Sequence, residues 1–273
     1  MNSNPVAVVT GASRGIGRAV TVALAAEGYD IVAVSRSVDS DAMNLLSQEV
    51  HRLGRHFFPV GLDVSQLERH EEIISLIAER YGRIDFLVLN CVVAPPNQCD
   101  LLEMSPEGFD SILSVSLKGP LFFAKGVARE MIWLRSQRPD VTPSIVFVTS
   151  SAAAVSMSCV ADFCIAKAGL SMASMVFADR LAEEGINVYE VRPGLISNDS
   201  AVKVKEEYDN MISNGVVPQG RWGTPDEVAK GIASIAGGDW NFSTGMVFEV
   251  SGGLCIRSVS RQNNHTKITG RAD

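Results

Sequence analysis

Short apolar runs rich in β-branched residues alternate with helix-length amphipathic segments along most of this chain. Seven runs have the length and composition of buried strands: Val6–Val9, Ile31–Val34, His56–Val60, Phe86–Leu89, Ile145–Thr149, Asn187–Val191 and Met246–Val250. Strands separated by helices pair in parallel, and their right-handed crossovers lay the helices on both faces of the sheet. The alternation therefore predicts an α/β fold with a doubly wound parallel sheet of about seven strands.

The length and the apolar content favour a single domain. A chain of 273 residues with 46% hydrophobic content can bury one sizeable core. We expect residues 1–257 to form this domain. Residues 258–273 are polar and have no apolar period, which is typical of a frayed tail.

Helix boundaries can be predicted from capping residues. In Thr224-Pro225-Asp226-Glu227, the Thr can cap, the Pro fits the first helical position and the Glu can reach back, so a helix should run to about Ala236. Gly28, Gly185 and Gly237-Gly238 follow helical stretches, where left-handed C-terminal caps are expected.

The charge balance and the chain's polar start exclude several partners. With 31 acidic against 24 basic residues, the surface should repel nucleic acid. No run approaches the roughly 18 uninterrupted apolar residues of a membrane helix, and the polar start Met1–Asn4 lacks a signal-peptide core, so we expect a cytoplasmic protein. Five cysteines without a Cys-x-x-Cys pair favour reduced buried thiols over disulfides or a metal site.

A glycine-rich turn follows the first predicted strand and precedes a predicted helix over Arg18–Glu27. Such a turn lets backbone N–H groups approach a pyrophosphate, and the helix presents its positive N-terminus to it. A plain tight turn is the alternative interpretation. The residues expected to contact the phosphates are Gly11, Ser13, Arg14, Gly15, Ile16 and Gly17.

The end of the second strand indicates the choice of coenzyme. A carboxylate there would favour NAD, because it would accept hydrogen bonds from the free ribose hydroxyls and repel the extra phosphate of NADP. This chain has Ser35 followed by Arg36, and Arg14 supplies a second guanidinium. The sequence therefore favours NADP(H) over NAD. Alternatively, both arginines are solvated surface charges.

In its ordered motifs the chain resembles the short-chain dehydrogenase/reductase family, and its 3-ketoacyl reductase-like members in particular. The resemblance covers roughly residues 5–256 and rests on the glycine turn, Asp63, Asn90, Ser150, Lys167 and Pro193-Gly194. It implies a Rossmann-like fold, a nicotinamide coenzyme and a small organic substrate.

The resemblance also implies further coenzyme contacts. Asp63-Val64 corresponds to the family's adenine contact, and Asn90 to the last Asn of its Asn-Asn-Ala-Gly motif, in which Val92 here replaces the Gly. Lys167 would hold the ribose. The residues implied near the nicotinamide are Pro193, Gly194, Ile196 and Asn198.

The catalytic end departs from the family pattern. Ser150 and Lys167 match the family's Ser and Lys, but Phe163 replaces the Tyr that donates a proton, and Ser116 stands where an Asn is expected. Phenylalanine has no proton to give. Because positioned acid catalysis is worth about a hundred- to ten-thousand-fold in rate, ordinary ketone reduction should be slow.

Three interpretations of this site remain open. An iminium or a conjugated enone could accept hydride without a protein acid. A substitute donor could act, with Ser150, Ser151, Asp162 or a water held by Lys167 as candidates. Alternatively, redox chemistry has been abandoned, which leaves an isomerase, a cyclase or a coenzyme-binding pseudoenzyme.

The remaining predictions concern assembly and the pocket. The segment from about Ala166 to Glu184 is apolar nearly all round, and family members often pair this helix and the one around Ser116–Met131, so a homodimer or homotetramer is expected. Residues 195–220 leave the carboxyl end of a strand and are the candidate substrate lid. Val92–Pro96 and Ala152–Cys159 are expected to shape the pocket.

Overall fold

Seven parallel strands form one sheet, in agreement with the predicted architecture. The computed structural model describes residues 4–91, 99–197 and 205–257. The strand order is β3-β2-β1-β4-β5-β6-β7. The strands are β1 Val6–Thr10, β2 Asp30–Ser35, β3 Phe57–Gly61, β4 Phe86–Leu89, β5 Ser144–Val148, β6 Asn187–Pro193 and β7 Val247–Val250. Their bounds lie within two residues of the predicted runs.

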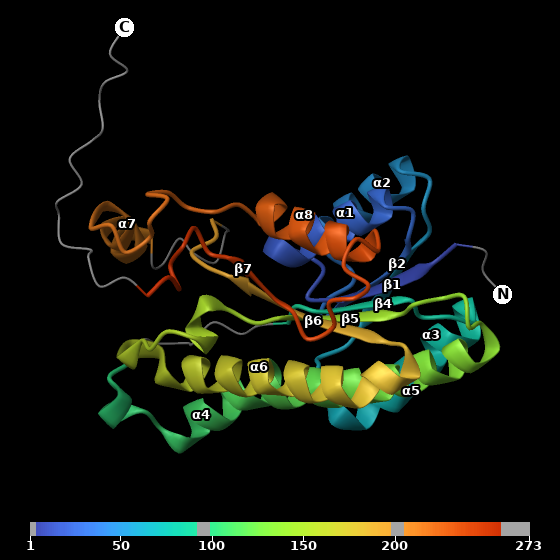
Figure 1. Cartoon of the computed structure of the whole chain (residues 1–273), viewed down its shortest axis with the longest axis horizontal. Coiled ribbons are helices and arrows are strands. Elements are labelled where there is room, and N and C mark those ends of the chain that lie inside the picture. Colours follow the sequence, from blue (N-terminus) through green and yellow to red (C-terminus); the bar gives the residue numbers. More distant parts are fainter. Residues whose placement is uncertain (1–3, 92–98, 198–204, 258–273) are drawn as a thin grey trace, which may run out of the picture.

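The α-helices cover both faces of the sheet, with α1, α2 and α8 on one side and α3, α4, α5 and α6 on the other (Figure 1). They are α1 Gly15–Ala26, α2 Asp41–Arg52, α3 His70–Tyr81, α4 Pro106–Leu113, α5 Gly119–Gln137, α6 Ala161–Leu181, α7 Lys205–Ser213 and α8 Pro225–Ala236. The helix predicted from Arg18 begins three residues earlier, because the last glycines of the turn already form its first turn.

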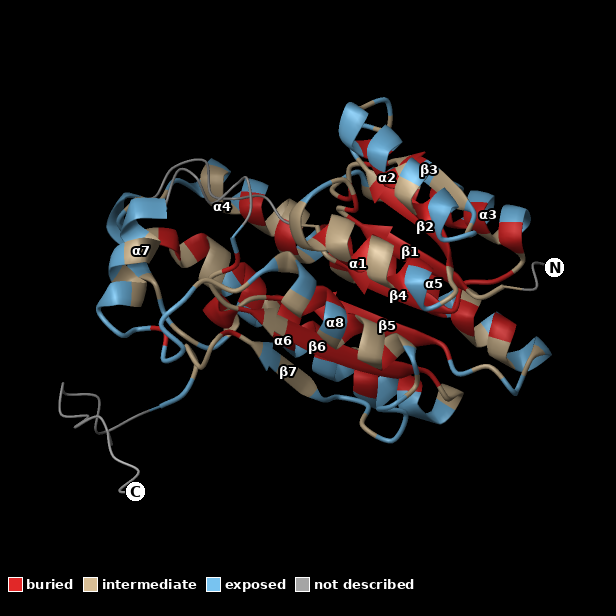
Figure 2. Ribbon diagram, turned by 90° about the horizontal axis from the view of Figure 1, so that it is seen from above, coloured by how far each residue is buried: buried red, intermediate tan, exposed pale blue. Residues whose placement is uncertain are grey.

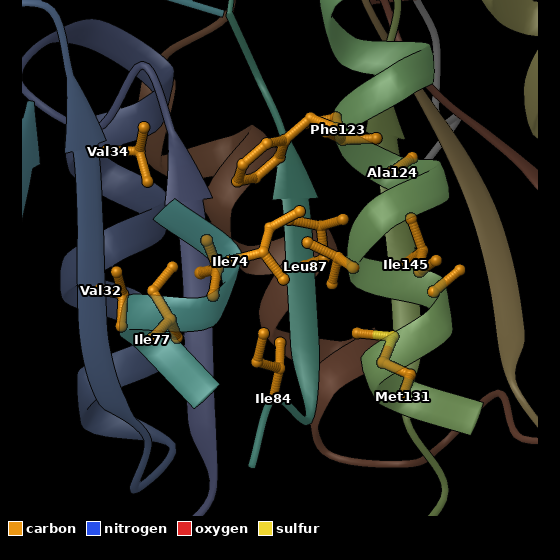
Figure 3. Packing of buried hydrophobic residues seen from close by; sticks show 14 of the residues in the cluster. Val32, Val34, Ile74, Ile77, Ile84, Leu87, Phe123, Ala124, Met131 and Ile145 are labelled. Carbon is orange, nitrogen blue, oxygen red and sulfur yellow. The ribbon is translucent and has the colours of Figure 1, made fainter. Parts of the chain in front are cut away.

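Alternate residues of the strands enter two different cores. Val6 and Val8 face α3, α5 and α6, whereas Ala7 and Val9 face α1, α2 and α8. This follows from the period of two in a strand, and strands buried on both faces are apolar throughout. Figure 3 shows the first of these cores, with side chains from α3 and α5 packed against the strands.

The capping predictions hold with one correction. Thr224 and Glu227 form the expected capping box, and α8 ends at Ala236. Gly28 and Gly185 have positive φ values of 97° and 69°. Gly237 was predicted to be left-handed but has φ −69°, because α8 continues in helical conformation through it. Gly238 adopts the left-handed conformation one residue later, with φ 86°.

A π-helical turn joins α4 to α5. It covers Ser114–Lys118 and is followed directly by the first turn of α5. Pro120 has no N–H to donate to the carbonyl of Ser116 four residues earlier, which disrupts the regular α-helical pattern at this point. Ser116 is therefore placed in a widened turn with 0% exposure.

The segment Ser158–Glu184, which contains α6, is long and apolar enough to cross a membrane by length and composition alone. In the fold, α6 packs against β5 and β6, and Leu170 and Leu181 belong to the core beneath the sheet. A core helix passes the same test of length and hydropathy. Packing in the described part of the chain thus explains the apolar residues on the sheet-facing side of α6, whereas Met172 and Val176 on the other side are exposed.

The carboxyl ends of the strands gather at one end of the sheet, where α4 and α7 also lie (Figure 2). In an open α/β sheet this is the end at which ligands bind. The glycine turn after β1, Asn90 after β4 and Ser150 after β5 all belong to this end.

Candidate functional site

The turn between β1 and α1 is built for close backbone approach. Gly11 and Gly15 have φ values of 67° and 53°, in the left-handed region that favours glycine. A Cβ atom at Gly17 would lie 2.1 Å from the carbonyl oxygen of Gly11 and 2.6 Å from the Asn90 side-chain nitrogen. No residue larger than glycine fits at Gly17 unless the turn moves.

The first turn of α1 leaves its N–H groups open to a ligand. Arg14 is the N-cap residue and makes no side-chain capping bond, and no acidic residue lies in the first turn. The positive end of the helix dipole therefore faces the turn without a protein anion to satisfy it. A pyrophosphate group has the charge and the acceptors that this cradle lacks, so the residues fit a dinucleotide.

The residues predicted to choose the coenzyme lie around the ends of β2 and β3. Ser35 donates a hydrogen bond to Ser13 across 3.3 Å, which ties β2 to the glycine turn. Arg14 and Arg36 are exposed. Asp63 accepts from the Ser65 amide and hydroxyl at 3.0 and 2.7 Å.

The charge environment of Asp63 links it to Arg36. Burial raises the pKa of Asp63, but the hydrogen bonds from Ser65 and the positive charge of Arg36 outweigh this and hold the pKa below its usual value. Asp63 is therefore a carboxylate at neutral pH. It can accept hydrogen bonds from a ligand amine.

Asn90 is fixed against the glycine turn from the end of β4. Its backbone N–H donates to the Thr10 hydroxyl at 3.0 Å, and its side-chain amide donates to the Gly11 carbonyl at 3.4 Å. The Cys91 N–H donates to the same hydroxyl at 3.3 Å. Val92 and the following pocket residues lie outside the described part of the chain.

Lys167 is buried at the centre of the predicted catalytic group. Its side chain is held by a hydrogen bond of 3.1 Å from Nζ to the Val148 carbonyl, at the end of β5. Burial lowers the pKa of Lys167 to about 8, an effect that the nearby Cys91 and Glu190 partly oppose. The ammonium lies 5.6 Å from the centroid of the Phe163 ring, one helical turn earlier in α6.

The two serines of the predicted catalytic set differ in their surroundings. Ser150 follows β5, is partly exposed, and its hydroxyl accepts from the Ala152 N–H at 3.1 Å. The hydroxyl of Ser116 is buried and has no hydrogen-bond partner among the described residues. Ser150 is available to a substrate oxygen, whereas Ser116 is a buried group whose hydrogen-bonding capacity is unused.

The turn after β6 is packed closely against the end of β7. The Gly194 N–H donates to the Val250 carbonyl at 3.0 Å, and a Cβ at Gly194 would lie 2.7 Å from the Ser251 Cα. Ile196 is buried and pairs with Gly223, and Pro193 ends β6. The predicted contact Asn198 lies outside the described residues.

The described ends of the predicted lid, Leu195, Ile196 and Gln219, line a polar cavity, and α7 lies between them in the chain. The cavity has a volume of about 260 Å³, and its lining includes Leu195, Ile196, Gln219, Glu249 and Ser251. The ring of Tyr208 in α7 packs on Trp222 at 5.7 Å between centroids. The segment 195–220 is thus anchored at both ends in the described structure, through the Ile196–Gly223 pairing and the Gln219–Gly252 backbone bond.

Sequence reasoning missed a buried ionic network beside Lys167. Glu190 is 2% exposed and accepts from Thr149 at 2.6 Å, Ser171 at 2.8 Å and Arg192 at 2.6 Å. Arg192 also bonds Glu249 at 3.3 Å. The signal was present in the sequence, because a Glu and an Arg two residues apart in an apolar strand point to the same face.

Comparisons with known proteins agree with the fold and the glycine turn. A sheet ordered 3-2-1-4-5-6 with a glycine turn after β1 is the arrangement of dinucleotide-binding α/β proteins. Residues 11–255 match the family described as enoyl-(acyl carrier protein) reductase. The chain belongs to the short-chain dehydrogenase/reductase family of oxidoreductases.

Relatives that match nearly the whole chain carry reductase names. The 3-oxoacyl-(acyl-carrier-protein) reductase FabG of Thermotoga maritima is 31% identical over 92% of this chain and 98% of its own length. A 3-oxoacyl-(acyl-carrier-protein) reductase of Synechocystis is 31% identical over 92% of this chain and 97% of its length.

Solved structures of similar proteins have the same fold. The 3-oxoacyl-(acyl-carrier-protein) reductase of Brucella melitensis in complex with NAD has a TM-score of 0.89 at 36% identity, covering 95% of this chain and all of that one. A putative 2-deoxy-D-gluconate 3-dehydrogenase of Agrobacterium tumefaciens with bound NADP has a TM-score of 0.82 at 23% identity, covering 93% and 97%. Since that identity is low, it supports the fold alone.

Proposed function

We propose that this protein is an NADP(H)-binding reductase that acts on small organic molecules which need no phenolic proton donor. The observation that carries the proposal is the pairing of an intact nucleotide cradle with a buried Lys167 that faces a benzene ring. Such a site keeps the groups that bind a coenzyme and lacks the usual acid.

The coenzyme would be held at several points by residues already described. Gly11, Gly15 and Gly17 would receive the pyrophosphate, Asp63 the adenine, and Lys167 the nicotinamide ribose. Arg14 and Arg36 would contact the extra phosphate of NADP, since both guanidinium groups are exposed beside the cradle. The coenzyme supplies hydride to the substrate.

Proton supply is the step that distinguishes this site. Phe163 has no ionisable hydrogen, so a neutral ketone would have to develop alkoxide charge without an acid beside it. Ser150 can donate a hydrogen bond to a substrate oxygen and stabilise part of this charge. The site therefore suits an iminium, which loses charge on reduction, or a conjugated enone, which spreads the developing charge.

The aromatic face of Phe163 supports the cationic substrate in particular. An aromatic ring face attracts a cation with about 0.5 to 2 kcal/mol, depending on desolvation. The ring already attracts the Lys167 ammonium at 5.6 Å, and its intermediate exposure keeps part of it accessible. An iminium beside the ring would meet the same attraction, which is largest when Lys167 is neutral, because the ammonium repels a second cation.

Assembly into a homodimer or homotetramer belongs to the same proposal. Apolar side chains of α5 and α6 remain exposed on the outer face of the chain, between 40% and 59% of each: Phe122, Trp133, Ile165, Met172, Met175 and Val176. Large apolar side chains exposed on two neighbouring segments of one family-typical interface support a subunit contact. Sedimentation should give a dimer or tetramer in the cytoplasmic extract, and a monomer alone would refute the assembly.

The runner-up is a redox-silent isomerase, cyclase or coenzyme-binding pseudoenzyme. It is favoured by the simultaneous changes at Phe163 and Ser116, since both depart from the family's catalytic set. In that case the nucleotide would still bind and its absorbance would not change with substrate.

One comparison separates the two proposals. The purified protein is mixed with NADPH, and the absorbance of the coenzyme is followed against matched ketones, enones and cyclic imines. We expect oxidation of NADPH with imines or enones and little with ketones. Binding of NADPH without turnover of any substrate would favour the runner-up, and absence of NADPH binding would overturn both.

A further inference from the structure

His70 is a buried histidine with one of its two ring nitrogens unpartnered. It begins α3 and is 5% exposed. Its Nε2 lies 2.9 Å from the Val64 carbonyl oxygen. Because a carbonyl can only accept, Nε2 carries the hydrogen, and Nδ1 is left as an acceptor with no partner among the described residues.

The Val64 carbonyl is held from two sides. His70 donates to it from α3, and the start of α5 packs against it so closely that a Cβ at Gly119 would lie 2.5 Å from the oxygen. The ring of Phe123 meets the imidazole edge-on, with 5.3 Å between centroids and 85° between planes. Figure 3 shows this phenyl ring reaching from α5 toward the strands and α3.

The contacts of His70 and of the start of α5 with the Val64 carbonyl form a clamp, which fixes the turn that follows β3. The Leu62 N–H donates to the Ser35 carbonyl at 3.0 Å, so the turn is also in register with the end of β2. Asp63 lies between these two fixed points, and its carboxylate is oriented further by Ser65. The position of Asp63 and Val64 therefore depends directly on the hydrogen bond from His70.

We propose that His70 is a positioning residue for the adenylate half of the nucleotide site, and that its protonation weakens adenylate binding. The inference rests on the proposed nucleotide-binding function. A hydrogen bond between neutral groups is worth about 0.5 to 1.5 kcal/mol net, so its loss should weaken binding by about two- to twelvefold.

Protonation acts through Nδ1. A hydrogen added there leaves the Nε2 donor in place, but it gives the buried ring a positive charge and a second N–H with no acceptor among the described residues, which destabilises the ring in its site. Glu68 is the charged group that acts on the imidazole, from the short helix before α3, and α5 presents an apolar ring to it. Burial lowers the pKa of His70, which the Val64 hydrogen bond and Glu68 oppose.

The direction of the pH effect follows from this. Neutral His70 is the form that the fold accommodates, so the clamp is intact above the ordinary histidine pKa of about 6.5. In the folded protein the imidazole stays neutral below that value and takes up a proton only as the pH falls through its own lowered pKa. Adenylate affinity should therefore decline on the acid side.

Two substitutions separate the hydrogen bond from the packing. In His70→Gln, the side-chain amide replaces the Nε2 donor and cannot titrate. In His70→Leu, the volume is filled and the donor is removed. Binding is measured by calorimetry with NADPH, with 2′,5′-ADP, which carries only the adenylate half, and with reduced nicotinamide mononucleotide, which lacks it.

We expect His70→Leu to weaken binding of NADPH and 2′,5′-ADP about two- to twelvefold at pH 7.5 and to leave the mononucleotide unchanged. His70→Gln should stay within about twofold of the wild type at that pH. As the pH falls from 7.5 through the pKa of folded His70, the wild type should lose more adenylate affinity than His70→Gln, because the ligand phosphate titrates alike in both.

Several results would overturn the inference. One is equal affinity of the wild type and His70→Leu for 2′,5′-ADP. Another is a loss of mononucleotide binding in His70→Leu as large as the loss of 2′,5′-ADP binding. A third is a pH profile of 2′,5′-ADP affinity that is parallel in the wild type and His70→Gln. If His70→Leu does not fold, the pH comparison with His70→Gln decides alone. Failure of the wild type to bind any probe would instead overturn the proposed function, and this inference with it.

Discussion

The ammonium of Lys167 lies 5.6 Å from the centroid of the Phe163 ring and is fixed by a hydrogen bond to the Val148 carbonyl. This places a desolvated cation within the roughly 6 Å range of a cation–π contact. The ring thus stabilises the charge of Lys167 and supplies no proton. Each of the following predictions tests a consequence of this arrangement or of the cradle beside it.

Phe163→Tyr should create ketone reductase activity. The new hydroxyl would stand one helical turn from Lys167, whose positive charge lowers the pKa of a neighbouring phenol. We expect kcat for simple ketones to rise about a hundred- to ten-thousand-fold, measured by NADPH oxidation. Phe163→Met is the matched control, because it adds no proton donor and should give no gain. A tyrosine variant that binds NADPH and stays inactive would contradict the prediction.

Coenzyme affinity should fall as the pH rises through about 8, the pKa of Lys167. The charged form donates to the ribose oxygens and is lost above this value. Isothermal titration from pH 7 to 9.5 should show the decline in the wild type, and Lys167→Met should show weak, pH-independent binding. A wild-type affinity that is flat over this range would argue against Lys167 as a ribose contact.

The lowered pKa of Lys167 also predicts a change in stability, which rises with pH whereas coenzyme affinity falls. Burial depresses the pKa of Lys167 from 10.5 to about 8, so between these values the unfolded chain binds more protons than the folded one. Lys167 then makes a contribution to the free energy of unfolding that rises with pH across this window. Urea denaturation of the wild type and of Lys167→Met at pH 8 and pH 10 should show this rise only in the wild type.

Gly17→Ala should damage both stability and nucleotide binding. The added Cβ would meet the Gly11 backbone at 2.1 Å, and backbone atoms cannot rotate away. Overpacking of this kind costs about 1 to 3 kcal/mol, and nucleotide affinity should fall with it. Gly231→Ala in α8 is the control, since the nearest atom to its Cβ is 3.9 Å away. Thermal unfolding with and without NADPH measures both effects, and an unaltered Gly17→Ala protein would refute the cradle.

Arg36→Asp should shift the coenzyme preference from NADP toward NAD. The carboxylate would repel the extra phosphate and accept hydrogen bonds from the ribose hydroxyls. Because Arg36 is exposed, the free energy of unfolding should barely change. Affinities for NADP and NAD are compared in the wild type, in Arg36→Asp and in the exposed control Arg52→Asp. An unchanged ratio in Arg36→Asp would rule out this role.

Much of the fold could be predicted from sequence because its signals are local. Apolar strands, the Thr224 capping box and the glycine turn each depend on a few neighbouring residues. The left-handed cap after α8 lies at Gly238 and not at Gly237, because the helical conformation continues through Gly237. The glycine turn and the strand ends could be placed because their spacing is fixed, and nucleotide binding by their residues stays a prediction.

Other parts of the site depend on contacts between distant segments. Glu190 forms hydrogen bonds with Thr149, Ser171 and Arg192 only once β5, β6 and α6 are packed together. In the sequence His70 has the pattern of an ordinary polar residue at the start of a helix, and its burial depends on the packing of α5 over it. Such contacts join residues far apart in the chain, and a local pattern such as Glu190 and Arg192 in one strand indicates only part of them.

The wide turn at Ser114–Lys118 sets the rotational phase of everything that follows it in α5. A π-helical turn carries an extra residue, so the helix beyond it is rotated relative to a straight continuation of α4. Regular α-helical winding of the same five residues would swing Phe123 and Val127 by about a quarter of a revolution, given about 3.6 residues per turn, away from β4. The apolar stripe of a long helix would then face water, although every amino acid in it was unchanged.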